Sequence, residues 1–276
     1  MCTFKELQDR AIKFDTASGY SVLLCENVFY NGPGTIYIKA SIYTANVVID
    51  KFCSFNSTTT ESYGHFAYFN ININSTILRG TISKGGNSDK TGMIYQTTDG
   101  HSSLSETNIS NCVTSNAAGF NYNAIQSTTN VSFCNFENLY AKSSMITEFS
   151  ISEGILERCN YINNSQVDNS HGLVFVSSKS LRILYCVFQN NLDRNLFSTN
   201  NGQIYIYHCN IDKYSEDIST GVINTHEMAT EPFQNDLKFI GLSPCEGELT
   251  INHNKQSPKS KLSTILLYIF VLVGKT

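Results

Sequence analysis

The sequence predicts an all-β fold: a right-handed parallel β-helix of about eight coils, with a short N-terminal capping helix and an apolar C-terminal helix. The main observation is a cysteine ladder, in which seven cysteines recur at steps of about 26 residues, with Gly80 at the position of a missing member. An aliphatic residue stands three positions before most rungs, and a large apolar residue stands two positions after. The ladder consists of Cys25, Cys53, Cys112, Cys134, Cys159, Cys186 and Cys209.

The N-terminal segment, residues 1–19, is expected to cap the first coil. Thr3 and Glu6 form a capping-box pair, and Phe4, Leu7 and Ala11 fall on one face of a helix over residues 3–14. Such a helix would cover the open end of a stacked sheet. The alternative is a frayed leader.

One coil can be laid out around a single rung. Leu181 and Ile183 are expected to point inward from a first strand, and Cys186 and Phe188 from a second. Strict alternation would place Ile183 and Cys186 on opposite faces of one strand, so the chain must bend between them. A second corner is expected four positions after the rung, where asparagine recurs in four copies, because asparagine adopts left-handed backbone angles at low cost. These asparagines are Asn116, Asn138, Asn163 and Asn190.

A third strand opens with a small or turn-forming residue at eight places in phase with the ladder, as at Gly172 with Val174 two positions on. Three short strands per coil at this period predict a β-helix over residues 20–240, with coils about 4.8 Å apart.

The cysteines of the ladder are expected to be buried free thiols that act as small hydrophobic side chains. Stacking places equivalent Cβ atoms near 4.8 Å apart, whereas disulfides require about 3.8 Å. Disulfides between neighbouring coils are the less favoured alternative. Metal binding is not expected, because the sequence has no Cys-x-x-Cys and no paired His spacing.

The C-terminal part departs from the repeat. Residues 241–261 are interpreted as a polar stalk, and residues 262–274 form an apolar run between Lys261 and Lys275. As a helix this run spans about 20 Å, which is short against a hydrocarbon core of about 30 Å. It is interpreted as a candidate membrane anchor; a truncated longer span and an apolar cap on the solenoid are the alternatives.

Composition limits the classes of partner. The net charge is −4 and charged residues make up 15% of the chain, so nucleic acid is not an expected partner. The first residues contain no apolar h-region, so no secretory signal peptide is visible. With the apolar tail, the expected localisation is a membrane, with the cell surface as one option.

A search for catalytic chemistry finds no convincing site. Carboxylates are scattered, and no two share a coil at a spacing that would oppose them, as glycoside hydrolysis requires. The most suggestive fragment is His171-Gly172, but Gly172 stands at a strand opening where Gly is needed structurally. We therefore expect no catalytic, cofactor-binding or metal site, and a protein that is not an enzyme.

The neighbourhood of the rungs, as in residues 183–190 with Cys186, Phe188 and Asn190, resembles the right-handed β-helix (pectin-lyase-like) superfamily. Within it, the chain is similar to the Asn- and Cys-rich β-helix proteins that parasitic protists encode in large surface families. That resemblance covers residues 20–240 and implies a fold and a surface location; a shared fold does not fix a function.

Two functions follow as hypotheses. The first is a non-enzymatic solenoid at a membrane that binds a host, matrix or cell-surface partner, either protein or carbohydrate. The second is a polysaccharide lyase or glycoside hydrolase with its site in a groove along one sheet.

Overall fold

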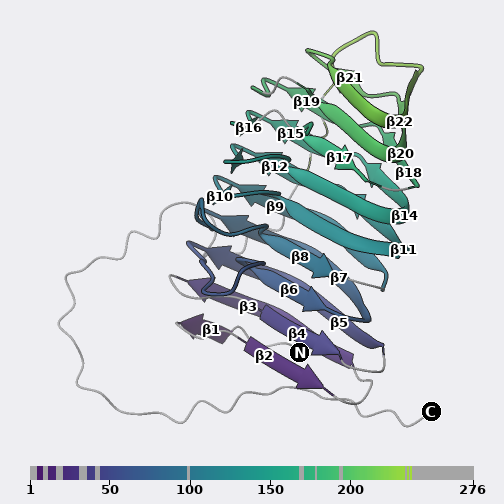
Figure 1. The fold of residues 1–276 in the computed structure, drawn as a ribbon. Coiled ribbons are helices and arrows are strands. Elements are labelled where there is room, and N and C mark those ends of the chain that lie inside the picture. Colours follow the sequence, from purple (N-terminus) through teal and green to yellow (C-terminus); the bar gives the residue numbers. More distant parts are fainter. Residues whose placement is uncertain are drawn as a thin grey trace, which may run out of the picture.

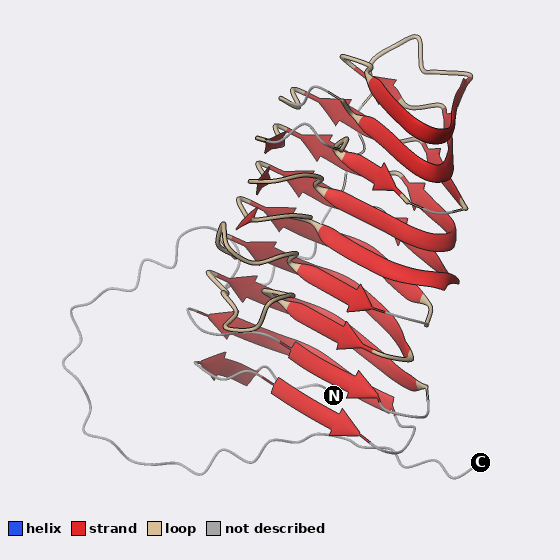
Figure 2. Cartoon of the chain, viewed as in Figure 1, coloured by secondary structure: helices blue, strands red, loops and turns tan. Residues whose placement is uncertain are grey.

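The computed structural model describes residues 5–8, 12–16, 21–30, 36–40, 44–97, 100–167, 171–177, 179–192, 195–233, 235 and 237. Within these residues the fold is an all-β parallel solenoid, and no helix occurs (Figures 1 and 2). None of the described segments is therefore a helix long and apolar enough to cross a bilayer.

Each coil has three sides. The first side is built by β3 (Ser21–Tyr30), β5 (Ala45–Phe55), β7 (Ile73–Ser83), β9 (Ser102–Ser110) and β18 (Ser180–Leu184), and the second by their continuations or by β12 (Asn135–Glu137), β15 (Asn160–Ile162), β19 (Val187–Gln189) and β21 (Asn210–Ile211). The third side is built by β2 (Ile12–Thr16), β4 (Ile36–Ala40), β6 (Ala67–Asn70), β8 (Ile94–Thr97) and β17 (Val174–Val176).

Four long strands continue from the third side of one coil into the first side of the next: β11 (Phe120–Ser132), β14 (Thr147–Glu157), β20 (Phe197–Tyr207) and β22 (Glu216–His226). Three very short strands, β10 (Val113–Thr114), β13 (Tyr140–Ala141) and β16 (Ser165–Gln166), form a small separate sheet after the second corner.

The coils stack in parallel, each strand pairing with its equivalent in the next coil. On the first side the order is β3, β5, β7, β9, β11, β14, β18, β20 and β22. The solenoid comprises about six turns, fewer than the eight expected. The stacked levels are visible in Figure 1. The hand of the coil stays a prediction.

The expected N-terminal capping helix is wrong for the residues that can be described. Lys5–Gln8 forms β1, which pairs with β3, and Ile12–Thr16 forms β2, which pairs with β4. Apolar residues alternate with charged ones in Ile12-Lys13-Phe14-Asp15, a period-2 pattern that suits a strand. The stacked sheet thus extends to this end of the chain. The rest of residues 1–19, the stalk at 241–261 and the apolar run at 262–274 lie outside the described residues.

Both corners of the coil place a non-glycine residue in the left-handed region. At the second corner this residue is Asn in most coils, with φ of 53° at Asn138, 53° at Asn163 and 54° at Asn190, which confirms the expected asparagine corner. Asn116, the fourth expected corner asparagine, does not stand at this corner; Asn111 does, with φ of 54°. The residues after the last two corners, Asn164 and Asn191, form a ladder inside the turn: the Asn191 carboxamide accepts from the Asn164 N–H at 3.0 Å and donates to Tyr161 O at 2.9 Å.

The interior is one continuous apolar core in which like residues stack. Phe136, Tyr161 and Phe188 follow each other with ring centroids 4.6 and 4.9 Å apart, and all three are fully buried. Phe188 then meets Phe197 edge to face at 5.0 Å. Parallel stacking brings identical positions of successive coils together, so rows of rings run along the axis.

The cysteine ladder is confirmed for its last four members and corrected for the first three. The pairing Asn135↔Asn160↔Val187↔Asn210 places Cys134, Cys159, Cys186 and Cys209 in one inward row. Cys53 instead lies one position later than this row, since Phe52 pairs with Gly80, and Cys25 lies two positions earlier, opposite Asp50. Cys112 is equivalent to Leu139 of the next coil, at the second corner, because Val113 pairs with Tyr140.

The row itself contains other residues in the early coils. Gly80, rightly placed as a member, lies next to Phe52 and Thr107. A Cβ on Gly80 would lie 2.2 Å from Cε1 of Phe52, so the ring already fills that space. Thr107 makes the same hydrogen bond as a thiol of the row. Its hydroxyl donates to Ser105 O at 2.8 Å. The cysteines of the row likewise donate to the carbonyl two residues earlier.

The thiols of the row are free and fully buried, as expected. Cys134, Cys159, Cys186 and Cys209 of the row, and Cys112 outside it, carry no disulfide and have no exposed surface. Cys53 is the exception to that expectation, because it is disulfide-bonded. Cys53 lies outside the thiol row, so the Cβ spacing of stacked cysteines, which argues against a disulfide, does not apply to it.

Candidate functional site

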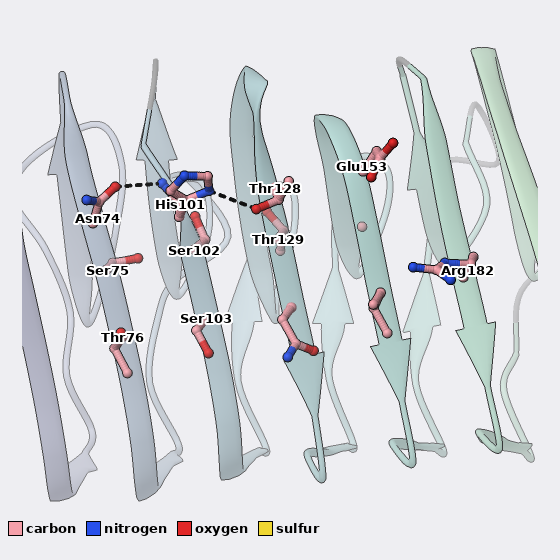
Figure 3. Close-up of a pocket in the computed structure, with 13 residues that line it drawn as sticks. Asn74, Ser75, Thr76, His101, Ser102, Ser103, Thr128, Thr129, Glu153 and Arg182 are labelled. Atoms are coloured by element: carbon pink, nitrogen blue, oxygen red, sulfur yellow. Dashed lines mark hydrogen bonds between the residues drawn. The ribbon is translucent and has the colours of Figure 1, made fainter.

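A groove of about 420 Å³ lies on the outer face of the first side of the coil. It crosses five coils, over β7, β9, β11, β14 and β18 (Figure 3). The inward residues of these strands are held by the core. Because side chains alternate across a strand, the residues between them must face the groove.

Two rows of side chains line the groove. The first row is Asn74, His101, Thr128 and Glu153, one residue from each of four coils. The second row, two positions further along each strand, is Thr76, Ser103, Asn130, Ile155 and Arg182. Within a row the residues repeat at the coil spacing of about 4.8 Å.

Hydrogen bonds between coils fix the first row. The Asn74 carboxamide oxygen accepts from the His101 backbone N–H at 2.9 Å, and His101 Nδ1 lies 2.7 Å from Thr128 Oγ1. Figure 3 shows these two bonds running along the row. His101 is thereby held between its neighbours, and its ring is exposed to solvent.

The groove is nearly neutral, and most of its lining residues are polar, although most of the surface that they expose to it is carbon. Its side-chain charges are Glu153 and Arg182, one of each sign, and the remaining lining is mostly hydroxyls and carboxamides. Such groups offer both donors and acceptors, so they suit a ligand that itself carries many hydroxyls. Glu153 is the single carboxylate in the lining, whereas glycoside hydrolysis uses two.

The floor of the groove is made of small residues: Ser75, Ser102, Thr129 and Gly154 occupy one inward row. The Ser75 hydroxyl donates to Gln96 Oε1 at 2.6 Å. A Cβ on Gly154 would lie 2.5 Å from Cδ1 of Ile151 and 2.9 Å from Cδ1 of Leu181. Glycine at this point therefore lets the two core side chains approach the sheet.

Perturbed titratable groups lie elsewhere than the groove. Burial lowers the pKa of His65 to about 4, and its Nδ1 accepts the Thr59 N–H at 3.2 Å. Desolvation raises the pKa of Glu148, which stands on the third side and bonds to Asn121 and Ser150. Neither His65 nor Glu148 lines the groove. Their hydrogen bonds are contacts within the wall of the solenoid.

The fragment around His171 does not form a catalytic arrangement with the groove. His171 packs edge to face on Phe175 at 4.2 Å, beside a small outer cluster with Ala117 and Met145. A Cβ on Gly172 would lie 2.6 Å from the Phe197 carbonyl carbon, so this glycine is required by close backbone approach. Among the scattered carboxylates, Asp50 forms an ion pair with Arg79 across one coil step.

Sequence reasoning missed the groove because it followed the inward positions. The signal was present: residues four positions before each member of the row face outward, and they include Thr76, Ser103, Asn130, Ile155 and Arg182. Reading them required the correct register in the coil of β9, where Thr107 and not Cys112 occupies the row.

Comparison with known proteins adds no family. No family model matches the chain, and neither the curated proteins nor the solved structures contain a match. The β-helix fold stands on the structure itself. The resemblance to pectin-lyase-like and protist surface proteins stays a prediction.

Proposed function

We propose that this chain is a non-enzymatic binding solenoid whose groove on the first side holds an extended carbohydrate chain. The observation that carries the proposal is the pair of rows over four and five coils, in which every residue except Ile155 is polar and a single one is a carboxylate. A regular array of this kind suits a polymer better than a compact ligand, because equivalent groups recur along one direction.

The physical case rests on matching repeat and chemistry. Hydroxyl and carboxamide groups about 4.8 Å apart along the axis offer one set of donors and acceptors per coil. A linear glycan presents hydroxyls at each sugar unit, so successive units can meet successive coils. Each contact contributes little, and affinity arises from their number.

The proposal is tested by binding to immobilised neutral and acidic polysaccharides. Asn130→Ala and Arg182→Ala remove groups from the second row and should each weaken binding several-fold. Lys142→Ala serves as the matched control, since Lys142 is exposed and stands outside the groove lining. Equal binding by all three variants and the unaltered chain would refute the groove as the site.

Glu153→Gln separates binding from catalysis. For a binding groove, loss of the Glu153 charge should leave affinity largely intact, because every other lining residue except Arg182 is uncharged. The alternative function, a polysaccharide lyase or glycoside hydrolase, is favoured only by His101 and Glu153 sharing one row. Under that alternative, incubation with pectic, chitin-like or glycosaminoglycan polymers would yield new reducing ends or unsaturated products, and Glu153→Gln would abolish them.

A membrane location forms part of the proposal. Its support is the apolar run at residues 262–274 between Lys261 and Lys275, which snorkelling and local thinning of the bilayer would accommodate. Detergent partitioning combined with protease protection on intact cells tests it. A chain that partitions into the aqueous phase and is not retained by cells would contradict the anchor, and adhesion through it.

A further inference from the structure

At one end of the groove, the polar side chains are already bonded to each other. Asn74 Oδ1 accepts from the His101 backbone N–H at 2.9 Å, and Asn74 Nδ2 donates to Asn46 Oδ1 at 3.0 Å. The Thr128 hydroxyl lies 2.7 Å from His101 Nδ1. These groups hold neighbouring coils together, so they have less capacity left for a ligand.

At the other end of the groove, three polar side chains have no such partner. Among the residues that the structure describes, the side chains of Asn130, Glu153 and Arg182 form no hydrogen bond or ion pair, and all three are exposed. Figure 3 shows Glu153 and Arg182 on the neighbouring strands β14 and β18. The charged and carboxamide groups that remain open to a ligand therefore gather at this end.

Ile155 lies in the middle of these three groups. It is the single aliphatic side chain in the groove lining, and it is half-buried. Asn130 is its register partner on one neighbouring coil and Arg182 on the other, each about 4.8 Å away. Glu153 precedes Ile155 by two residues on β14, so it lies on the same face about 6.6 Å away.

The chemistry of this arrangement is specific. An ionised carboxylate only accepts hydrogen bonds, a guanidinium only donates them, and a carboxamide does both. The frame around Ile155 therefore offers an acceptor at Glu153, donors at Arg182 and Asn130, and an apolar contact between them. An acetamido group matches all three features, because its N–H donates, its carbonyl oxygen accepts and its methyl group is apolar.

Other sugar substituents match this frame less well. A hydroxyl group forms hydrogen bonds but leaves Ile155 without an apolar contact. A carboxylate is attracted by Arg182 and repelled by Glu153, whereas the acetamido group is neutral and is opposed by neither charge.

We infer that the groove takes a glycan of N-acetylated amino sugars, with one acetamido methyl group on Ile155. The acetamido N–H donates to Glu153, and the carbonyl oxygen accepts from Arg182 or Asn130. The remaining sugar units follow the second row over Ser103 and Thr76. This inference rests on the proposed function, a glycan-binding groove, and adds the class of sugar.

Three oligosaccharides of equal length and the same backbone test the sugar class: a chitin oligomer, its N-formyl analogue and a cellulose oligomer. In calorimetry on the full chain, the chitin oligomer should bind about tenfold more tightly than the cellulose oligomer, since the amide adds hydrogen bonds and a methyl contact. The N-formyl analogue lacks only the methyl group and should bind about fourfold more weakly than the chitin oligomer.

The outcomes separate this inference from the proposed function. Equal affinity for the three oligomers, or binding only to polysaccharides without acetamido groups, would overturn the sugar class and leave the glycan-binding groove standing. Binding to no glycan at all would overturn both.

Ile155→Ser tests the position of the methyl group. This variant should bind the chitin oligomer and its N-formyl analogue equally, with its affinity for the cellulose oligomer unchanged. Ile155→Val keeps the apolar contact and should keep the preference. Val222→Ser is the matched control, because Val222 is exposed on the same side of the coil and stands outside the groove lining. An undiminished preference for the methyl group in Ile155→Ser would refute its placement on Ile155.

Glu153 variants test the acceptor. Glu153→Gln keeps an oxygen for the acetamido N–H and should retain the preference for the chitin oligomer over the cellulose oligomer. Glu153→Ala removes the acceptor and should reduce that preference several-fold. An unchanged preference in Glu153→Ala would overturn the assignment of Glu153 as the acceptor.

Discussion

At the residue scale, the first corner of the coil uses side chains that do not favour its backbone geometry. Phe133, Arg158, Tyr185 and His208 all have φ between 50° and 54°, a region that L-residues enter at a cost of about 1 kcal/mol or more. Stacking offsets part of that cost. The Arg158 guanidinium lies 5.1 Å from the Tyr185 ring, and Tyr185 stacks on His208 at 5.0 Å and 11°. The thiols that follow these residues hold the bend through hydrogen bonds to carbonyls two positions earlier.

His65 makes stability depend on pH. Burial lowers its pKa from 6.5 to about 4, so the unfolded chain binds more protons between these values. Its contribution to the free energy of unfolding is fully present above pH 6.5 and falls by about 3 kcal/mol as pH drops through 4. Urea titrations at pH 7.5 and 4.5 should show that His65→Asn, which keeps an acceptor for the Thr59 N–H, loses less stability on acidification than the unaltered chain. Equal losses would contradict the assignment.

The two buried tyrosines of the core are predicted to respond differently to removal of their hydroxyls. Tyr122 is fully buried, its hydroxyl has no hydrogen-bond partner, and burial raises its pKa. Tyr122→Phe should leave stability unchanged or raise it by up to about 1 kcal/mol, because an unpaired polar group is removed. Tyr161→Phe, the matched control, breaks the 3.2 Å contact with Thr147 Oγ1 and should lower stability by about 1 kcal/mol. The opposite order in thermal or urea unfolding would disprove this account.

At the scale of the element, the inward row of the rungs is governed by volume as much as by residue type. Phe52 and Gly80 are complementary neighbours, and the Phe52 ring stacks on Phe66 at 4.7 Å. Thr107 keeps the hydrogen bond of a thiol with a hydroxyl. A rung therefore needs a side chain that fits its two neighbours and donates a hydrogen bond to the carbonyl two residues earlier, or else a neighbour that fills the space.

Gly80→Ala tests this complementarity. The added methyl would lie within 2.2 Å of the Phe52 ring, and the core should lose about 1–3 kcal/mol of stability through overpacking. The double variant with Phe52→Leu should recover part of that loss, since the shorter side chain vacates the site. Additive losses in a double-mutant cycle would show that the two positions do not compete for space.

The asparagine corners were predictable because their cause is local. Asn138, Asn163 and Asn190 adopt the left-handed angles that their residue type accepts most readily. The misplaced Cys112 has a local cause too. Its thiol donates to Ser110 O at 3.2 Å after Asn111 in the left-handed region, which repeats at the second corner the motif of the first. Sequence spacing cannot distinguish two corners that use the same local chemistry.

At the scale of the whole molecule, the stacked coils form a wall with one continuous core and chemically distinct outer faces. The first side carries the groove, and on the second side the side chains of Asn210 and Asn160 donate hydrogen bonds to Phe233 O and Asn235 O. The two surfaces come from different positions of the same repeats. A ligand in the groove therefore need not displace residues 233 and 235 from the second side.

Thiol titration tests the state of the core as a whole. Five cysteines are free and fully buried, so native protein should protect them and denatured, unreduced protein should expose at least five reactive thiols. Their release should follow the cooperative loss of the β signal in circular dichroism, because the row lies inside a single core. A count below five would show that disulfides had formed within the row.

The sequence by itself determined the parallel solenoid, its two corners and the inward rows of its later coils. These follow from period-2 alternation, from residue types that tolerate left-handed angles, and from a repeat that is too short for a propeller blade and lacks the leucine-rich pattern. Only the tertiary structure decided the register of the early coils, the groove, and the position of Cys53 outside the inward row. Outward positions carry no hydrophobic constraint and loops differ in length, so neighbours across coils are fixed only when the coils stack.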